Sequence, residues 1–335
     1  MKVLITVYSK SETLDLGFLI EDIITEIYPI QEPEKQNPKP FTALQIKPAL
    51  DYAMKHEFDL VVCADPIYER LAIAVRKYRR GAFIFLNIHQ LAAILFNRWN
   101  QKAPEESLLC LKSIHLSDML DNMAAQFELD CIRRIINPGE LKKEVGKHQA
   151  LDEKQSICAF NIDQQVIHTG YTFGEVIQLL IELEKDRRNR GETIFDELME
   201  LYQQYGFYKE KAVSVDFTGE KQKKNLLSIM EGIRKDPNIL EHILPLSTIT
   251  DYRKGKKKNL LTNKNYEFIN ITGNVLRIDS TRNISLTFAP SDARMIHYAS
   301  IRVGITSKGQ YADRNQDLDL EIINAIKMLN KVLKK

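Results

Sequence analysis

Hydrophobic positions in residues 1–99 follow two different periods. Nearly continuous apolar runs, which predict buried strands, are KVLITVY (2–8), FDLVVCAD (58–65), LAIAVRK (71–77) and GAFIFLN (81–87). Apolar residues at helical spacing, which predict helices, occur in LGFLIEDIITEI (16–27), ALQIKPALDYAMKHE (43–57) and IHQLAAILFNRWN (88–100). Three prolines in residues 30–41 predict a loop. Because strands and helices alternate, we expect an α/β domain with a partly parallel sheet.

The same alternation of periods continues over residues 100–206. Strands are predicted at SLLCLKSIH (107–115), LDCIRRII (129–136) and SICAFNI (156–162). Helices are predicted at LSDMLDNMAAQF (116–127), ELKKEVGKHQALDEK (140–154), YTFGEVIQLLIELEKDRRNR (171–190) and TIFDELMELYQQYG (193–206). Ser117 and Thr172 stand where helix N-caps are expected, and Gly206 where a helix ends. We therefore expect a second α/β domain.

In residues 207–335 most strands follow one another without intervening helices. A strand at KAVSVDFT (211–218) and a helix at KKNLLSIMEGIRKDP (223–237) come first. Strands are then predicted at YEFINIT (266–272), NVLRID (274–279), ISLTFA (284–289) and MIHYASIRVGI (295–305), before an amphipathic helix at 318–335. This order favours an α+β domain, in which helices cover one face of an antiparallel sheet.

The composition indicates an ordinary globular protein. Of the 335 residues, 44% are hydrophobic and 27% are charged, and 47 basic against 45 acidic residues leave a formal net charge of +2. That balance predicts neither a nucleic acid nor a membrane surface as partner. The lysine-rich stretch 253–259 is expected to be a solvated loop, because no interleaved aromatic residues provide a stacking platform. No apolar run reaches the roughly 18 residues of a transmembrane helix.

The cysteines and the N-terminus favour a cytoplasmic protein. The four cysteines, Cys63, Cys110, Cys131 and Cys158, lie in apolar segments and form no CxxC pattern. Free buried thiols are therefore expected in place of a zinc site. The first residues lack a small-residue cleavage site and read as a first strand, not a signal peptide.

The stretch DPIYER (65–70) carries the candidate chemistry. It places Asp65, Glu69 and Arg70 in a loop directly after an apolar strand, and such carboxylate-rich loops often hold a hard cation. Ile67 lies between the two acids, where a third oxygen ligand would be useful. The residues alone leave three alternatives open: a metal site, a degraded metal site, or a turn in which the acids cap the backbone and pair with Arg70.

Three stretches resemble the α-D-phosphohexomutases, the phosphoglucomutase/phosphomannomutase superfamily. DLVVCADPIYERLAIAVR is similar to the family's metal-loop strand, and LKSIHLSDMLDNMA to its Lys-[ST]-Ile-x-x-Ser-Asp segment. DELMELYQQYGFYKEK is similar to its Leu-Tyr-x-x-Tyr-Gly-x-Tyr-x-Glu-Lys segment. GNVLRID and FAPSDARMIHY then follow where the family's last domain has a strand and a phosphate loop.

The resemblance implies a fold and an activity. Two mixed-sheet α/β domains at 1–99 and 100–206 would precede an α+β domain, TATA-binding-protein-like, at 207–335. Members of the family move a phosphoryl group between O1 and O6 of a hexose through a phosphoserine in a preceding domain. An Asp-x-Asp-x-Asp loop holds Mg²⁺, a Gly-Glu-Glu-Ser-Gly loop binds the sugar, and an Arg-Pro-Ser-Gly-Thr-Glu-Pro loop grips the phosphate.

This sequence departs from the family at the metal and sugar loops. Asp65 matches the first metal ligand and Glu69 could imitate the third, but Ile67 replaces the middle one, so the two acids are expected to be vestigial. AFNIDQQ (159–165) replaces the sugar loop, with Asn161 and Ile162 in the places of the two glutamates. Glutamines at 164 and 165 replace glycines that let backbone approach a ligand.

The phosphate loop and the phosphoserine segment also differ. APSDARMIHY is shorter than the family's loop, and Ala289 replaces its arginine. Ser291 and Arg294 remain as weak candidate phosphate contacts. Residues 1–60 already match the start of the family's second domain, and no Thr-Ala-Ser-His-Asn-Pro segment occurs. We therefore expect a chain that lacks the serine-bearing first domain and the first step of phosphoryl transfer.

Loss of several motifs together favours a non-catalytic homologue, a pseudoenzyme with no catalytic residue and no cofactor. Such a protein is expected to act as a protein-interaction, structural or regulatory scaffold. Surface that the missing domain would cover favours a protein partner or self-association, through residues 10–40 or the helix at 87–100.

The alternative is a sugar-phosphate binder or an isomerase subunit in carbohydrate metabolism. Either a partner chain would supply the serine domain in trans, with Mg²⁺ as cofactor, or the cleft would hold a different phosphorylated ligand with Arg70, Arg294 and His297. His89 begins a helix that faces the cleft in the family. A lone histidine there is expected to be a capping or core residue and not an acid–base catalyst.

Overall fold

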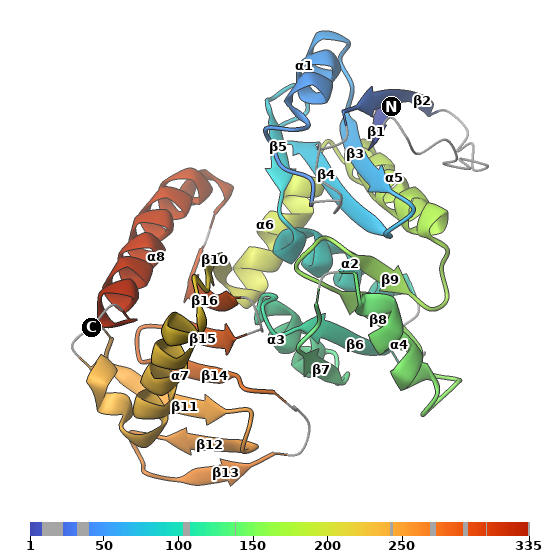
Figure 1. Ribbon diagram of the computed structural model, residues 1–335. Helices are drawn as coiled ribbons and strands as arrows, with labels where there is room; N and C mark the ends of the chain where they lie inside the picture. Colours follow the sequence, from blue (N-terminus) through green and yellow to red (C-terminus); the bar gives the residue numbers. More distant parts are fainter. Residues whose placement is uncertain are drawn as a thin grey trace. The chain divides into compact units, whose positions relative to one another are not determined.

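The computed structural model describes residues 1–8, 23–31, 40–102, 108–137, 139–241, 244–268, 273–290, 294–305 and 307–333. The chain forms two compact units, Met1–Tyr205 and Gly206–Lys335. Both combine helices with β-sheets (Figure 1). The predicted division into three domains remains a prediction. No helix in the described part of the chain is both long and apolar enough to cross a membrane.

The first unit begins with a five-stranded sheet in the order β2-β1-β3-β4-β5. Its strands are β1 Lys2–Tyr8, β2 Ile24–Ile30, β3 Leu60–Asp65, β4 Arg70–Arg76 and β5 Phe83–Leu86. β1 pairs in parallel with β2 and β3, whereas β3, β4 and β5 pair antiparallel. The sheet is therefore mixed, as the alternation of periods predicted.

Two helices accompany this sheet, α1 Lys47–Lys55 and α2 Ile88–Lys102. Pro48 lies in the first turn of α1, where its missing N–H would have no intrahelical partner. Ala49 and Ala53 of α1 pack with Leu4 and Val61 of the sheet in one apolar core. α2 buries ten of its side chains, among them Trp99, so this helix belongs to the interior of the first unit.

The second sheet of the first unit has four strands in the order β7-β6-β8-β9. They are β6 Leu108–Ser113, β7 Cys131–Arg134, β8 Ser156–Phe160 and β9 Val166–His168. The neighbouring helices are α3 Met119–Gln126, α4 Leu141–Gln149, α5 Phe173–Asn189 and α6 Ile194–Tyr205. β6 pairs in parallel with β7 and β8, and β9 returns antiparallel to β8. Three-residue β9 has too short an apolar pattern to be predicted.

Two of the three predicted helix-end residues are confirmed. Thr172 forms a capping box with Glu175 at the start of α5. Gly206 follows α6 with a φ of +94°, a left-handed conformation in which glycine is not strained. The prediction for Ser117 is wrong by one residue. Asp118 is the N-cap of α3, although the Ser117 hydroxyl accepts from the Met119 N–H at 3.3 Å.

The second unit contains an antiparallel sheet of seven strands in the order β10-β16-β15-β14-β11-β12-β13. They are β10 Phe207–Asp216, β11 Leu246–Asp251, β12 Lys256–Asn259, β13 Asn265–Glu267, β14 Leu276–Ser280, β15 Ile284–Pro290 and β16 Arg294–Val303. The helices are α7 Glu220–Lys235, the 3-10 turns η1 Pro237–Leu240 and η2 Lys308–Gln310, and α8 Tyr311–Leu333. The antiparallel sheet with two long helices agrees with the predicted α+β pattern.

Two secondary-structure predictions are wrong. Residues 24–27 were expected in a helix but form the start of β2, because pairing with β1 selects the extended form of β-branched Ile24, Thr25 and Ile27; residues 16–22 lie outside the described part. Within the lysine-rich stretch, 256–259 form β12 instead of a loop. Its backbone pairs with β11 and β13 while the lysine side chains stay exposed.

Candidate functional site

The candidate metal loop is the turn between β3 and β4. Asp65 ends β3 directly opposite Arg70, the first residue of β4. One carboxylate oxygen of Asp65 accepts from the Tyr68 N–H at 3.4 Å, so this acid caps the turn. Glu69 has a φ of +51°, which lets the chain reverse within four residues. Ile67 is 70% exposed at the tip of the turn.

The segment in the place of the family's sugar loop connects β8 to β9. Asn161, Asp163, Gln164 and Gln165 are all buried, although four polar side chains within five residues would ordinarily favour a surface loop. Gln164 has a φ of +68°. The backbone at Gln164 is therefore left-handed. The resemblance expects glycine at this position, but the residue here has a long side chain.

The two loops bind one another through the backbone. The Leu71 N–H donates to the carbonyl of Gln164 at 3.0 Å, and the Val166 N–H donates to the carbonyl of Glu69 at 3.0 Å. Arg70 and Gln165 consequently face each other in an isolated antiparallel bridge. This pair of hydrogen bonds, which we call the clasp, joins the five-stranded sheet to the four-stranded sheet.

Arg70 is the cation at the centre of this contact. Its guanidinium donates to Asp163 at 3.2 Å and lies 3.8 Å from the carboxylate of Asp65, and all three side chains are about 4% exposed. The same Asp163 oxygen accepts from the Gly139 N–H at 3.0 Å. The guanidinium also stacks over the Tyr68 ring, 4.8 Å from its centroid. Arg70 is therefore held by two loops on different sheets.

Gln164 and Gln165, in the loop between β8 and β9, also form hydrogen bonds with other segments of the chain. The side-chain oxygen of Gln164 accepts from the Phe41 N–H at 2.6 Å, and its amide donates to the Phe41 carbonyl at 2.9 Å. Gln165 donates to the Tyr68 carbonyl at 3.1 Å and accepts from the Gly139 N–H at 3.1 Å. The Gln164 amide thus satisfies two buried backbone groups, and the Gln165 amide contacts two that are partly buried.

This arrangement does not fit a Mg²⁺ ion. The cation prefers about six oxygen ligands in near-octahedral geometry, whereas Asp65 is directed to Arg70 and to the turn backbone. Glu69 forms an ion pair with Lys142 at 3.4 Å, and Ile67 between them offers no oxygen. In the described part of the chain no group of three or more His, Cys, Asp or Glu side chains could hold a metal.

The candidate residues of the phosphate loop belong to the second unit. Ser291 lies outside the described residues. Arg294 is exposed and begins β16 opposite Asp216 of β10. His297, which the alternative function would use, is 1% exposed and packs edge-on against Phe288 with ring centroids 5.6 Å apart. Burial lowers the pKa of His297 to about 4, so this ring is neutral at pH 7.

His89 is a structural hydrogen-bond acceptor, as predicted for a lone histidine at this place. Its Nδ1 accepts from the Ser117 N–H at 3.2 Å, which links α2 to the turn before α3. Burial, assisted by the nearby charge of Lys112, lowers the pKa of His89 to about 3. A ring that stays neutral over the physiological range and accepts a backbone hydrogen bond is not positioned as a general acid.

Sequence reasoning missed several charged residues in the interior, among them Asp163 and Lys112. Asp163 pairs with Arg70 across 93 positions in the chain, a distance at which no local pattern signals contact. Lys112 is completely buried; its ammonium donates to the carbonyls of Leu116 and Ser117 at 3.1 and 2.7 Å and pairs with Asp121 at 2.6 Å. The Lys-Ser-Ile-x-x-Ser-Asp resemblance around Lys112 was the available signal.

These sheets and loops define an α/β fold of the phosphohexomutase type. Structures that resemble the chain include a phosphoglucomutase/phosphomannomutase family protein from Burkholderia thailandensis, with a TM-score of 0.59 at 8% identity over 100% of this chain and 60% of the other. Parafusin, a phosphoglucomutase from Paramecium, matches with a TM-score of 0.54 at 10% identity over 87% of this chain and 50% of the other. Such low identities support the fold alone.

A sequence relationship supports the same family. A phosphoglucomutase from Staphylococcus aureus strain MSSA476 is 25% identical over 235 residues, which make up 69% of this chain and 42% of that enzyme. The chain thus spans less than half the length of this curated relative. No model of a known protein family matches it. Together, the sequence and the fold confirm the resemblance to the phosphoglucomutase/phosphomannomutase superfamily.

Proposed function

We propose that this chain is a non-catalytic relative of the phosphohexomutases, which serves as a protein-interaction, structural or regulatory scaffold. The observation that carries the proposal is the buried Asp65–Arg70–Asp163 contact. This contact joins, inside the protein, the two loops that stand in the places of the family's metal loop and sugar loop. Because all three side chains are only about 4% exposed, little of their surface is available to a substrate.

The proposed partner contact lies on the edge strand β2. α2, the other segment expected to meet a partner, is buried inside the first unit. β2 is the outermost strand of the five-stranded sheet, and Ile24 and Ile27 on it are 60% and 50% exposed. Edge strands with exposed apolar side chains pair readily with another chain. A protein partner or a second copy of this chain is therefore the expected ligand, not a sugar phosphate, a nucleic acid or a membrane.

The remaining features of the proposal follow from the scaffold role. We expect the second unit to keep the TATA-binding-protein-like arrangement of the family's last domain, the protein to act in the cytoplasm, and its function to need no cofactor. Retention of the packing segments beside altered loops supports selection for folding more than for phosphoryl transfer.

An activity and binding assay tests the proposal. The purified protein is titrated by calorimetry with glucose 1-phosphate and glucose 6-phosphate, with and without Mg²⁺, and interconversion is followed beside a known phosphoglucomutase as positive control. We expect no turnover and no binding that depends on Mg²⁺. Turnover, or Mg²⁺-dependent binding, would instead establish the sugar-phosphate alternative.

A further inference from the structure

A charged pocket lies at the other ends of the strands that carry the loop 65–70. It has a volume of about 470 Å³, within the range of about 300–1,000 Å³ typical of small-molecule sites. Its seven described lining residues are Met54, Glu57, Asp59, Arg76, Arg79, Arg80 and Arg188. β3 and β4 run antiparallel from this pocket to the Asp65–Arg70 turn, and strands of this length span about 20 Å. The pocket is therefore separate from the candidate site above.

Arg76 is a buried cation whose backbone hydrogen bonds go to carbonyl groups. Its Nε donates to the Phe58 carbonyl at 2.7 Å, and its Nη1 to the Gly81 carbonyl at 2.7 Å. Both acceptors are neutral. Burial lowers the pKa of Arg76 and the charge of Arg188 contributes to the lowering, while Asp59 and Glu57 oppose it. An anion in the pocket would further offset the cost of burying this guanidinium group.

Arg188 reaches the pocket from the last turn of α5. Its guanidinium pairs with Asp59 at 2.7 Å and with Glu184 at 2.7 Å, and the side chain is 12% exposed. Its buried Nη2 finds no hydrogen-bond partner in the described part of the chain. A buried guanidinium nitrogen without an acceptor is costly, so a ligand oxygen at this position would be stabilising.

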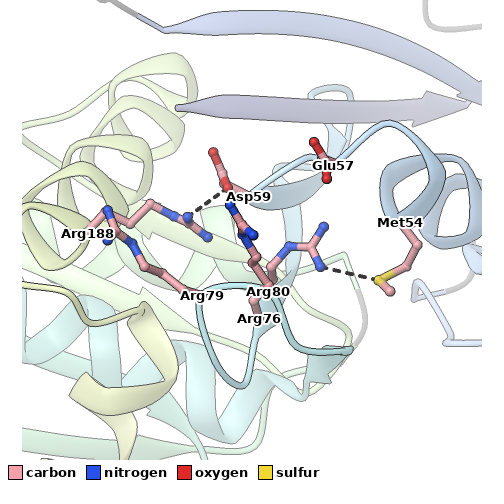
Figure 2. Close-up of a pocket in the computed structure, with 7 residues that line it drawn as sticks. All are labelled: Met54, Glu57, Asp59, Arg76, Arg79, Arg80 and Arg188. Carbon is pink, nitrogen blue, oxygen red and sulfur yellow. Dashed lines mark hydrogen bonds and ion pairs between the residues drawn. The ribbon is translucent and has the colours of Figure 1, made fainter.

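Arg79 and Arg80 add two exposed guanidinium groups from the turn between β4 and β5. The turn is closed by hydrogen bonds from Lys77 to Ala82 and from Gly81 to Tyr78, at 3.1 and 2.8 Å. In Figure 2 the arginines of this hairpin lie between Arg188 and Met54. Four arginines against two acids leave an excess of two positive charges in the pocket.

We propose that this pocket binds a phosphorylated small molecule, with Arg79, Arg80 and the Nη2 of Arg188 contacting the phosphate oxygens. Guanidinium groups bind phosphate through paired hydrogen bonds, and the charge excess matches a phosphate group of about −2. Because six of the seven lining residues are charged, the rest of the ligand is polar. The site requires no chemistry at Asp65 or Arg70 and goes beyond the proposed scaffold role.

Calorimetric titration of the whole protein at constant ionic strength tests the site, with inorganic phosphate and pyrophosphate as probes and citrate as a carboxylate control. We expect at least one phosphate probe to bind with a Kd below about 1 mM, and citrate at least about tenfold more weakly. The double variant Arg79→Gln/Arg80→Gln should weaken phosphate binding by at least about tenfold, since each substitution removes a charged hydrogen-bond donor. Both residues are exposed, so the variant is expected to fold.

Arg190→Gln provides the matched control. This arginine lies two positions after Arg188, has a 58% exposed side chain and does not line the pocket, so its variant should bind within about twofold of the wild type. Circular dichroism verifies that both variants fold. The proposal is overturned if neither probe binds, if citrate binds as tightly, or if the double variant and Arg190→Gln behave alike.

Discussion

Arg70, the first residue of β4, donates to Asp163 in the loop between β8 and β9 at 3.2 Å, with both side chains about 4% exposed. Removal of one partner from a buried ion pair leaves an uncompensated charge in the interior. We predict that Arg70→Met lowers the free energy of unfolding by about 3–5 kcal/mol. Urea unfolding followed by circular dichroism measures the change.

An exposed ion pair supplies the comparison for Arg70→Met. Arg98 and Asp186 are 2.7 Å apart with side chains 19% and 51% exposed, so Arg98→Met should cost no more than about 1 kcal/mol. The double variant Arg70→Met/Asp163→Leu should recover part of the loss, since it removes the charge of Asp163, although Asp65 still lacks the guanidinium group. Equal effects of Arg70→Met and Arg98→Met would show that the buried contact is not stabilising.

Gln164 is predicted to be a stabilising residue through its two hydrogen bonds to the backbone of Phe41. Gln164→Ala leaves a buried N–H and a buried carbonyl without partners, at a cost of about 2–4 kcal/mol. Gln45 makes a comparable contact to the Thr42 N–H in an exposed position at 3.0 Å, so Gln45→Ala should cost less than about 1 kcal/mol. Measurement of the two melting temperatures tests this prediction, and Gln164→Ala should melt at the lower temperature. Similar values for the two variants would contradict the prediction.

His168 should contribute to a loss of stability in acid. Its Nδ1 accepts from the Gly170 N–H at 3.0 Å, and its ring packs on Trp99 with centroids 4.6 Å apart. Burial lowers the pKa of His168 from 6.5 to about 4. Because the unfolded chain takes up the proton first, the stability from this group is present above pH 6.5 and is lost as the pH falls towards 4.

The size of this effect is roughly 2–3 kcal/mol between pH 7 and pH 4.5. His168→Phe keeps an aromatic ring but cannot titrate, so it should be less stable than the wild type at pH 7 and show a smaller loss on acidification. Urea unfolding at both pH values measures the difference, and an NMR titration of His168 gives its pKa. A pKa near 6.5 would disprove the explanation.

The cysteines are predicted to resist alkylation in the folded protein. Cys131, Cys110 and Cys158 occupy one register row across β7, β6 and β8, and Cys63 is buried in β3. Burial raises the thiol pKa of Cys63, and burial together with neighbouring thiols raises those of Cys110 and Cys131. Since the thiolate is the reactive form, iodoacetamide at pH 8 should label these positions only after denaturation. Mass spectrometry identifies the labelled peptides, and rapid labelling of the native Cys110 would contradict the prediction.

The sequence was sufficient for elements whose periodicity is strong and local. β3, β4 and α2 carry long apolar patterns, and Thr172 was recognisable because a capping box lies within four residues. β2 was not recognisable, because its apolar residues also fit a helix and only pairing with β1 selects the extended form.

Sequence reasoning located the loop 65–70 of the candidate site but not the residues that contact this loop. The resemblance located Asp65, Glu69 and Arg70 in one turn, and the structure places Asp65 opposite Arg70. The resemblance did not reveal that Asp163 would approach Arg70, since the contact depends on how the second sheet packs against the first. The same limit applies to Arg188, which meets Asp59 across 129 positions of sequence at 2.7 Å.

The clasp between Glu69 and Val166 and between Leu71 and Gln164 has a mechanical consequence. An enzyme that must admit a substrate, turn it over and release it needs a gap that opens and shuts. Any separation of the five-stranded sheet from the four-stranded sheet would break these two backbone hydrogen bonds. It would also expose Arg70, which lies between the carboxylates of Asp65 and Asp163, to water. The bonds that fasten these layers thus favour rigidity over motion, which supports the scaffold role that we propose.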